Sequence, residues 1–231
     1  MNIIVKNIPN SITCLNIAAG CMAILCALKG ESGLWGLTGL DWAYIFVGIA
    51  AIADFLDGFA ARILHAYSDL GKELDSLCDA VSFGVAPAII MYATLSDTVA
   101  YEWLKWTVIL IPVAGVLRLA KFNIDTRQTT SFIGLPIPAN AIFWIGYSAI
   151  CREGSILSTE WYFFLPVLLF ECWLMVSPLK LFSLKFKRWG WRGNEYRWIL
   201  ILTAILLLCF CGVTGLMWLI IAYLVIGLIA K

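Results

Sequence analysis

Apolar runs long enough to cross a lipid bilayer recur along the 231-residue chain, and they constrain its fold more than any other feature. A membrane-spanning helix needs about 20 mostly apolar residues. Hydrophobic residues make up 62% of the sequence and charged residues only 13%, well below the share in soluble domains. We therefore predict an all-α integral membrane protein, a helical bundle of about eight transmembrane helices. The expected spans are 10–28, 42–64, 74–96, 102–122, 136–151, 160–177, 197–212 and 214–230.

Basic residues are distributed unevenly across the predicted membrane plane. Lys29, Lys105 and Arg152 fall on one side, and the other 13 of the 16 Lys and Arg residues fall on the opposite side. Because cytoplasmic loops are enriched in bases, we expect a multi-pass protein of the inner (cytoplasmic) membrane with both termini in the cytoplasm. The net charge of +1 gives no reason to expect binding to nucleic acid.

Four aspartates interrupt the apolar pattern at the cytoplasmic ends of the second and third spans. Asp54 and Asp57 are three residues apart, and Asp75 and Asp79 are four apart, so each pair lies on one face of its helix. The connection between the two helices is short, which makes them antiparallel neighbours. All four carboxylates can then converge on one point, where they would repel one another and be costly to leave unpaired.

Divalent cations are suitable partners for such a cluster. Carboxylate oxygens are hard ligands that suit Mg²⁺ or Mn²⁺, and two divalent ions would balance four carboxylates. Two-metal sites are used for displacement at phosphorus. The small residues Gly58, Ala61 and Gly71 leave space for a flat group, and Arg62 can clamp a phosphate. The residues together predict a site for a nucleoside diphosphate.

Two other interpretations use the same residues. A divalent-cation transporter also needs clustered aspartates, but it gives the glycines and Arg62 no role and predicts acidic residues in several spans. The spans after the third are nearly free of them, apart from Glu171. His65 is the sole histidine and a candidate base, but it lies in the connecting loop, off the carboxylate face.

The pattern from Asp54 to Asp79, Asp-x2-Asp-Gly-x2-Ala-Arg-x8-Gly-x3-Asp-x3-Asp, resembles the signature of the CDP-alcohol phosphotransferases, with every fixed position present. The resemblance implies a homodimer with a site open to the cytoplasm. It also implies a six-helix catalytic core in residues 1–180. Residues 181–231 would then add a basic, aromatic link at the membrane surface and two further helices.

The same resemblance assigns roles to individual side chains. The metal ligands would be Asp54, Asp57, Asp75 and Asp79, and Asp79 would also be the general base. The residues expected to bind CDP-diacylglycerol are Asn10, Thr13, Asp57, Gly58, Ala61, Arg62, Ser68 and Gly71. Asn10 and Thr13 belong to a Pro-Asn-x-x-Thr motif that also reads as the start of the first helix, with both residues as caps.

Three later stretches resemble the phosphatidylserine synthase branch of this family: SFGVAPA at 82–88, LRLAKFN at 117–123 and FIGLPIPAN at 132–140. They imply L-serine as the acceptor, and a zwitterionic amino acid needs a cation for its carboxylate and acceptors for its ammonium. The residues expected to bind serine are Arg118, Lys121, Asn123 and Ser82. Lys121 departs from the Arg that is commoner in this branch but keeps the charge.

Simpler roles for these four residues stay open. Arg118 and Lys121 could anchor lipid phosphates, Asn123 could cap its helix, and Ser82 could bond to the helix backbone. The acceptor could also be glycerol 3-phosphate or inositol phosphate. A phosphorylated acceptor would need a larger basic pocket than Arg118 and Lys121 supply.

Overall fold

The structure is a computed structural model of the whole chain, and it describes residues 3–30, 33, 35–98, 101–124, 132–154, 159–181, 190 and 194–229. The helices are α1 (Ile3–Ala27), α2 (Gly39–Ile63), α3 (Asp69–Asp79), α4 (Ala86–Thr98), α5 (Leu110–Ile124), α6 (Ile137–Arg152), α8 (Trp161–Val176), α9 (Glu195–Cys211) and α10 (Gly215–Ile229). Two-residue strands, β1 (Phe132–Ile133) and β2 (Lys180–Leu181), pair antiparallel. The predicted all-α bundle is confirmed.

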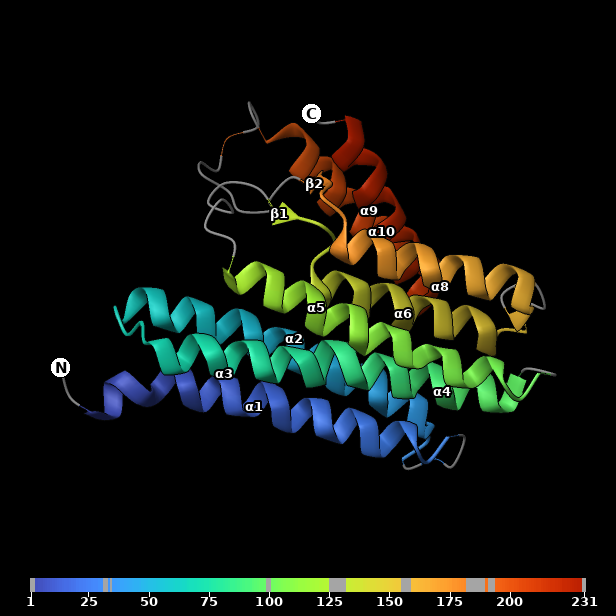
Figure 1. Cartoon of the computed structure of the whole chain (residues 1–231), viewed down its shortest axis with the longest axis horizontal. Coiled ribbons are helices and arrows are strands. Elements are labelled where there is room, and N and C mark those ends of the chain that lie inside the picture. The colour runs from blue at the N-terminus through green and yellow to red at the C-terminus, as the bar shows by residue number, and fades with distance from the viewer. Residues whose placement is uncertain are drawn as a thin grey trace.

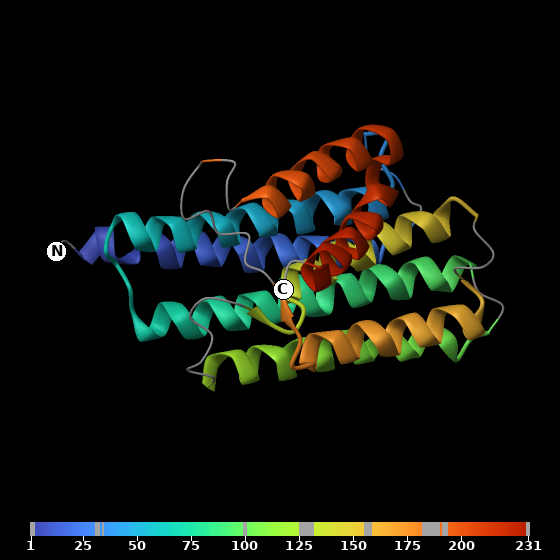
Figure 2. The ribbon, with the colours of Figure 1, turned by 90° about the horizontal axis from the view of Figure 1, so that it is seen from above.

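Every predicted span coincides with a helical segment. The third span is continuous from α3 through a π-helical segment, Ala80–Val85, into α4, and a 3₁₀ segment, Leu104–Ile109, leads into α5. In Figure 1, α1, α2, α3–α4, α5, α6 and α8 lie side by side as a bundle, and α9 and α10 rise from it at a steep angle. Figure 2 shows that α9 and α10 form a V-shaped hairpin across the bundle.

The lengths of the helices suit a membrane protein. Five helical stretches of the described residues are long and apolar enough to cross a membrane: Asn7–Ala27, Gly39–Ile63, Asp69–Asp97, Leu104–Ile124 and Glu195–Leu228. Glu195–Leu228 includes both α9 and α10. The chain reverses there because Gly212 has a positive φ of 58° and Gly215 packs directly on the Leu207 carbonyl. Trp161–Val176 is a shorter apolar helix.

The start of α1 corrects one expectation. The alternative interpretation placed Asn10 and Thr13 in the cap of the first helix, but α1 begins at Ile3, and Pro9 lies inside it. Asn10 and Thr13 therefore lie within α1 and not at its N-terminal cap. Thr13 donates a hydrogen bond to the Pro9 carbonyl 3.0 Å away, one turn earlier in the helix.

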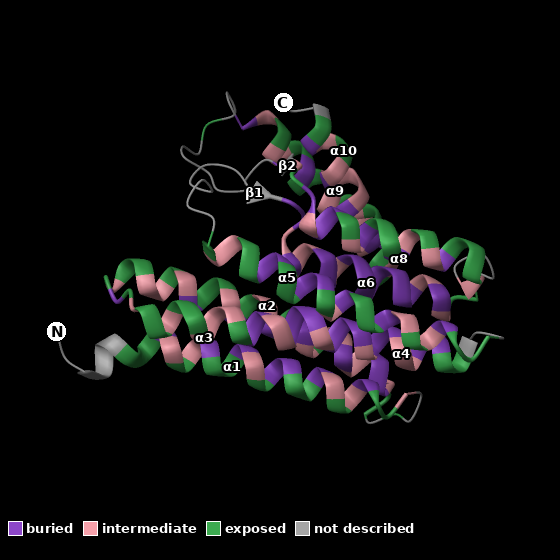
Figure 3. Ribbon diagram, in the orientation of Figure 1, coloured by how far each residue is buried: buried purple, intermediate pink, exposed green. Residues whose placement is uncertain are grey.

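The buried side chains form one continuous core between the helices, as the purple segments in Figure 3 show. Trp144 and Tyr147 of α6 and Phe164 of α8 are fully buried and make edge-to-face or tilted ring contacts at its centre. Large apolar side chains such as Ile52 and Phe55 of α2 remain more than half exposed. This pattern is expected where helices face lipid hydrocarbon instead of water.

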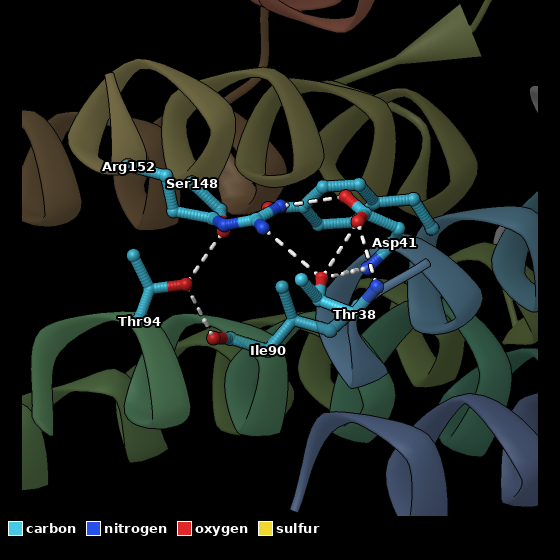
Figure 4. A network of polar contacts seen from close by, with 7 residues as sticks. Thr38, Asp41, Ile90, Thr94, Ser148 and Arg152 are labelled. Carbon is cyan, nitrogen blue, oxygen red and sulfur yellow. Dashed lines mark hydrogen bonds and ion pairs between the residues drawn. The ribbon is translucent and has the colours of Figure 1, made fainter. Parts of the chain in front are cut away.

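A polar network joins the helices at the end of the bundle where α2 begins (Figure 4). Arg152 donates to Asp41 Oδ1 at 2.8 Å and to Thr38 Oγ1 at 3.0 Å. The hydroxyls of Ser148 and Thr94 lie 2.6 Å apart, and this pair connects α6 to α4. A cavity of about 610 Å³ lies beside the network and is also lined by the tip of the α9–α10 hairpin. These contacts fix the end of the bundle opposite the aspartates.

Candidate active site

Three of the four signature aspartates form a compact cluster where α2 and α3 face each other. Asp54 and Asp57 come from α2 and Asp75 comes from α3, and one carboxylate oxygen of each lies within 4.8 Å of the others. The five-residue connection between the helices, 64–68, turns sharply at His65, which has a positive φ of 50°. The spacing on the two helices thus brings these carboxylates together as predicted.

The cluster has the donor set of a divalent-cation site. Asp57 Oδ2 and Asp75 Oδ1 are buried and have no hydrogen-bond donor among the described residues. Buried polar atoms are usually paired, and a buried carboxylate oxygen without a donor is costly. Hard, negatively charged oxygens at this mutual distance fit Mg²⁺ or Mn²⁺. The residues present therefore fit the expected metal, although the number and kind of ions stay a prediction.

Helix α1 supplies a row of polar side chains to this cluster. Asn10, Thr13 and Asn16 recur every three residues and so share a face of α1. A Cβ on Gly71 would lie 3.0 Å from Asn10 Oδ1, which shows how closely α3 approaches this face. The buried Thr13 hydroxyl lies against the Asp57 carboxylate. The N-terminal motif and the aspartate signature therefore meet in space.

Asp79 lies one turn deeper in α3, within electrostatic range of the other three aspartates. Its side chain is buried, and its Oδ1 accepts a hydrogen bond from Asn16 Nδ2 at 3.2 Å. Asn16 is not among the residues predicted from the sequence to form the site. Its position three residues after Thr13, on the face that carries Asn10, was the signal that could have indicated it.

The small residues beside the cluster leave open space at the end of α2. A Cβ on Gly58 would meet only Arg62 Nη2, 3.6 Å away. Arg62 is exposed, and its Nε donates to the Gly58 carbonyl at 3.0 Å, which lays the guanidinium along the helix. Ala61 is half-buried. Ser68 caps α3 by accepting a hydrogen bond from the Gly71 amide at 3.0 Å.

The four residues expected to bind serine lie in different surroundings. Arg118 of α5 is buried, stacks on the Phe122 ring and donates through Nε to the Leu135 carbonyl at 3.0 Å. It also lies within electrostatic range of Asp79. Lys121 is exposed and donates to the Val176 carbonyl of α8 at 3.2 Å.

Asn123 and Ser82 make contacts between helices. Asn123 Nδ2 donates to Ser76 Oγ of α3 at 2.9 Å, which places the end of α5 beside the carboxylate face. Ser82 is fully buried, and its hydroxyl donates to the Asn16 carbonyl of α1 at 3.0 Å. Bonding to a helix backbone was the simpler role considered for Ser82. The contact of all four residues with serine stays a prediction.

The sequence model of the CDP-alcohol phosphatidyltransferases matches residues 6–179, three quarters of the chain. The chain belongs to this family. The matched segment contains the aspartate cluster, Asn16 and Arg118, and it ends before α9, so the hairpin of α9 and α10 lies outside the part that defines the family.

Several curated members of the CDP-alcohol phosphatidyltransferase family are similar to the chain. A CDP-diacylglycerol–serine O-phosphatidyltransferase of Mycobacterium leprae is 43% identical over 62% of this chain and 47% of its own length. One of Helicobacter pylori is 32% identical over 79% of this chain and 74% of its own. An archaetidylserine synthase of Methanothermobacter thermautotrophicus is 36% identical over 58% of this chain and 54% of its own length. The chain thus spans about half the length of the mycobacterial relatives it matches.

Proposed function

We propose that the chain transfers the phosphatidyl group of CDP-diacylglycerol to the hydroxyl of L-serine and releases CMP. The observation that carries this proposal is the convergence of Asp54, Asp57 and Asp75 within 4.8 Å, with two buried oxygens that find no donor in the described part of the chain. This is the arrangement that a metal-dependent reaction at phosphorus needs. The choice of serine is supported by the names of the relatives, which include CDP-diacylglycerol–serine O-phosphatidyltransferases and an archaetidylserine synthase.

In this proposal CDP-diacylglycerol enters from the lipid with its acyl chains left in the bilayer. Gly58 and Ala61 provide the open surface on which cytosine lies, and Arg62 reaches the diphosphate from the same turn. Asn10 and Thr13 of α1 and Ser68 and Gly71 at the start of α3 close the opposite wall of the nucleotide site. The proximity of Asn10 Oδ1 to Gly71 supports this wall, because any side chain at position 71 would be forced against it.

The carboxylates of Asp54, Asp57, Asp75 and Asp79 would hold two divalent cations, Mg²⁺ or Mn²⁺. When bound, such ions neutralise phosphate charge and stabilise the departing CMP. The chain's own contribution is to hold the carboxylates rigidly on α2 and α3 and to exclude water with the packed core behind them. Asp79 takes the proton from the serine hydroxyl, which then attacks the lipid-side phosphorus directly, so that no covalent enzyme intermediate forms.

Arg118 is the proposed partner of the serine carboxylate. Its guanidinium is buried and oriented by Leu135 and Phe122, which supports a role in orienting a small anion. Lys121 and Asn123 lie one turn further along α5, and Asn123 is tied to Ser76 on the carboxylate helix. Ser82 completes the predicted set, with the contact to Asn16 described above.

The active site would open to the cytoplasm. The contact of Lys72 with the Asn123 carbonyl, at 3.5 Å, and that of Lys121 with Val176 place these bases at the aspartate end of the bundle. The ion pair between Arg152 and Asp41 lies at the opposite end. This distribution supports an inner-membrane protein with both termini in the cytoplasm. Lys6, Arg127, Lys231 and all the bases of 180–192 lie outside the described side chains. We also expect a homodimer, as the resemblance implies.

Two alternatives make different predictions. Another member of the family could use glycerol 3-phosphate or inositol phosphate as its acceptor, and it would also release CMP. A divalent-cation transporter could use the same carboxylates but would release none. Among the described membrane-spanning residues, buried carboxylates are concentrated at one end of the bundle, apart from Glu171 of α8, which favours an enzyme.

The test is CMP release by the purified full chain with CDP-diacylglycerol and Mn²⁺ or Mg²⁺. Each reaction is run with L-serine, glycerol 3-phosphate, inositol phosphate or no acceptor. We expect release that depends on serine and disappears with a chelator. Release only with a phosphorylated acceptor would show that serine is not the acceptor, but it would still agree with the proposed role of the aspartates. No release with any alcohol would overturn the proposal and leave transport to be measured with liposomes.

A further inference from the structure

Asn16 has a place in the site that neither the signature nor the resemblance predicts. Its side chain is fully buried on α1, and its Nδ2 donates to Asp79 Oδ1 at 3.2 Å. It lies three residues after Thr13 and six after Asn10, on the face of α1 that lines the carboxylates. The residue therefore contacts the proposed base directly, from a different helix.

One end of the Asn16 amide is left without a hydrogen bond. Its Oδ1 is buried and has no partner among the described residues, as is also true of Asp57 Oδ2 and Asp75 Oδ1. Buried polar groups usually have a hydrogen-bond partner. Asn140 Nδ2 and Glu171 Oε2 also lack one among the described residues, and Asn16 differs from them in its direct bond to Asp79.

The backbone that carries Asn16 is fixed. The Asn16 carbonyl accepts a hydrogen bond from Ser82 Oγ at 3.0 Å, and Gly20 packs on Ser82 one turn later in α1. Ser82 lies in the π-helical segment that begins directly after Asp79. Short π-helical segments often occur at functional sites, and this one brings the Ser82 hydroxyl onto the same residue of α1 whose side chain holds Asp79.

The consequence of these contacts is a fixed orientation for one of the four carboxylates. Asp54, Asp57 and Asp75 have oxygens within 4.8 Å of one another, and Asp79 accepts a hydrogen bond from the Asn16 amide. With Oδ1 occupied by the Asn16 donor, the second oxygen of Asp79 has a defined direction. A base that must meet a substrate hydroxyl needs this fixed geometry.

We propose that Asn16 is the positioning residue for Asp79. Its amide donates to Oδ1 and so fixes the orientation of the Asp79 carboxylate from α1, with Oδ2 left for the attacking hydroxyl. This inference rests on the proposed function, in which Asp79 is the general base.

The test is steady-state kinetics of Asn16→Ala with L-serine, together with the Kd for CDP-diacylglycerol and the thermal midpoint of the purified chain. Misplacing a reacting group by about 1 Å can cost about 10²-fold in rate. We expect kcat to fall by about that factor, while the KM for serine and the Kd for CDP-diacylglycerol change by less than about threefold. Leu15→Ala, on the exposed face of α1, is the matched control and keeps wild-type kcat.

A second variant, Asn16→Ser, replaces the amide by a hydroxyl on a shorter side chain, which is still a donor for Asp79. Its kcat should lie between those of wild type and Asn16→Ala. If the alanine variant does not fold, the kcat of Asn16→Ser tests the role of Asn16 instead. Wild-type kcat in both variants would overturn the inference, and so would a kcat loss matched by equal loss of CDP-diacylglycerol binding. If the wild type itself releases no CMP with serine, the proposed function fails first and this inference falls with it.

Discussion

Gly20 of α1 and Ser82 of the π-helical segment are in closer contact than any larger residue at position 20 would permit. A Cβ on Gly20 would lie 2.3 Å from Ser82 Oγ and 2.8 Å from Ser82 Cα. The second of these atoms belongs to the backbone and cannot rotate away. This contact sets the distance between α1 and the segment that follows Asp79, and with it the position of Asn16 against the carboxylate.

We predict that Gly20→Ala destabilises the protein by about 1–3 kcal/mol, the usual cost of overpacking. It should also lower CMP release, because the two helices that hold Asp79 must move apart. Gly48→Ala is the matched control, since nothing lies within 4 Å of a Cβ at Gly48 of α2. Thermal unfolding in detergent and turnover of both variants are the measurements. Equal thermal midpoints and equal turnover in Gly20→Ala and Gly48→Ala would contradict the prediction.

The cluster of three carboxylates gives a second prediction, for metal binding. Asp54→Asn removes a charge from the group and should weaken Mn²⁺ binding and CMP release by at least about 100-fold. Even substitution of a residue that only hydrogen-bonds to a metal ligand commonly lowers metal affinity or activity by about 10–100-fold. Asp97→Asn changes an exposed aspartate at the far end of the bundle and serves as the control. Electron paramagnetic resonance of added Mn²⁺ measures binding without turnover. Unchanged Mn²⁺ affinity in Asp54→Asn would remove the metal from this cluster.

Asp79→Asn tests whether Asp79 acts as the general base or only helps to bind the substrate. The amide keeps the size of the side chain but cannot take a proton, so turnover should be abolished while CDP-diacylglycerol binding is largely retained. Calorimetric titration of the lipid nucleotide and CMP release are measured on the same preparation. Full activity of this variant would exclude Asp79 as the general base.

The architecture and the carboxylate cluster could be predicted from the sequence because both depend on local periodicity. Apolar runs of helical length determine where the spans lie, and spacings of three and four residues put each aspartate pair on one helix face. A short loop then brings α2 and α3 together. None of these steps requires the register of helices that are distant in sequence.

The parts that could not be predicted depend on such registers. The bond between Asn16 and Asp79 joins residues 63 positions apart, and it exists because Gly20 lets α1 approach the π-helical segment. Nothing in the local pattern around Ala80 indicates π-helical geometry. The start of α1 was also hard to place, because Pro9 commonly marks the first turn of a helix. Here the helix begins six residues earlier and continues through the proline.

Arg118 gives a prediction that separates the acceptor site from the nucleotide site. Arg118→Lys keeps the charge but loses the planar fork that Leu135 and Phe122 orient, so the KM for serine should rise by at least about tenfold. The Kd for CDP-diacylglycerol should stay unchanged. Arg62→Lys, at the end of α2, should raise the Kd for CDP-diacylglycerol and leave the KM for serine unchanged. A change in CDP-diacylglycerol binding with Arg118→Lys, and none in serine KM, would assign Arg118 to the lipid phosphate.

The ion pair between Asp41 and Arg152 is expected to serve stability and not the reaction. It joins the start of α2 to the end of α6. Both side chains are partly exposed, Asp41 at 32% and Arg152 at 22%, so solvent screening reduces the contribution of the pair to stability.

Asp41→Asn should lower the free energy of unfolding by about 1 kcal/mol and the thermal midpoint by about 2–4 °C, as expected for a chain of this size. The kinetic constants for serine and CDP-diacylglycerol should not change. Glu102→Gln changes the 84% exposed carboxylate of the pair with Lys105, where solvent screening is strong, and as the control it should leave the midpoint unmoved. A loss of turnover in Asp41→Asn without a fall in the midpoint would show that this end of the bundle is coupled to the aspartates, and would contradict a purely structural role.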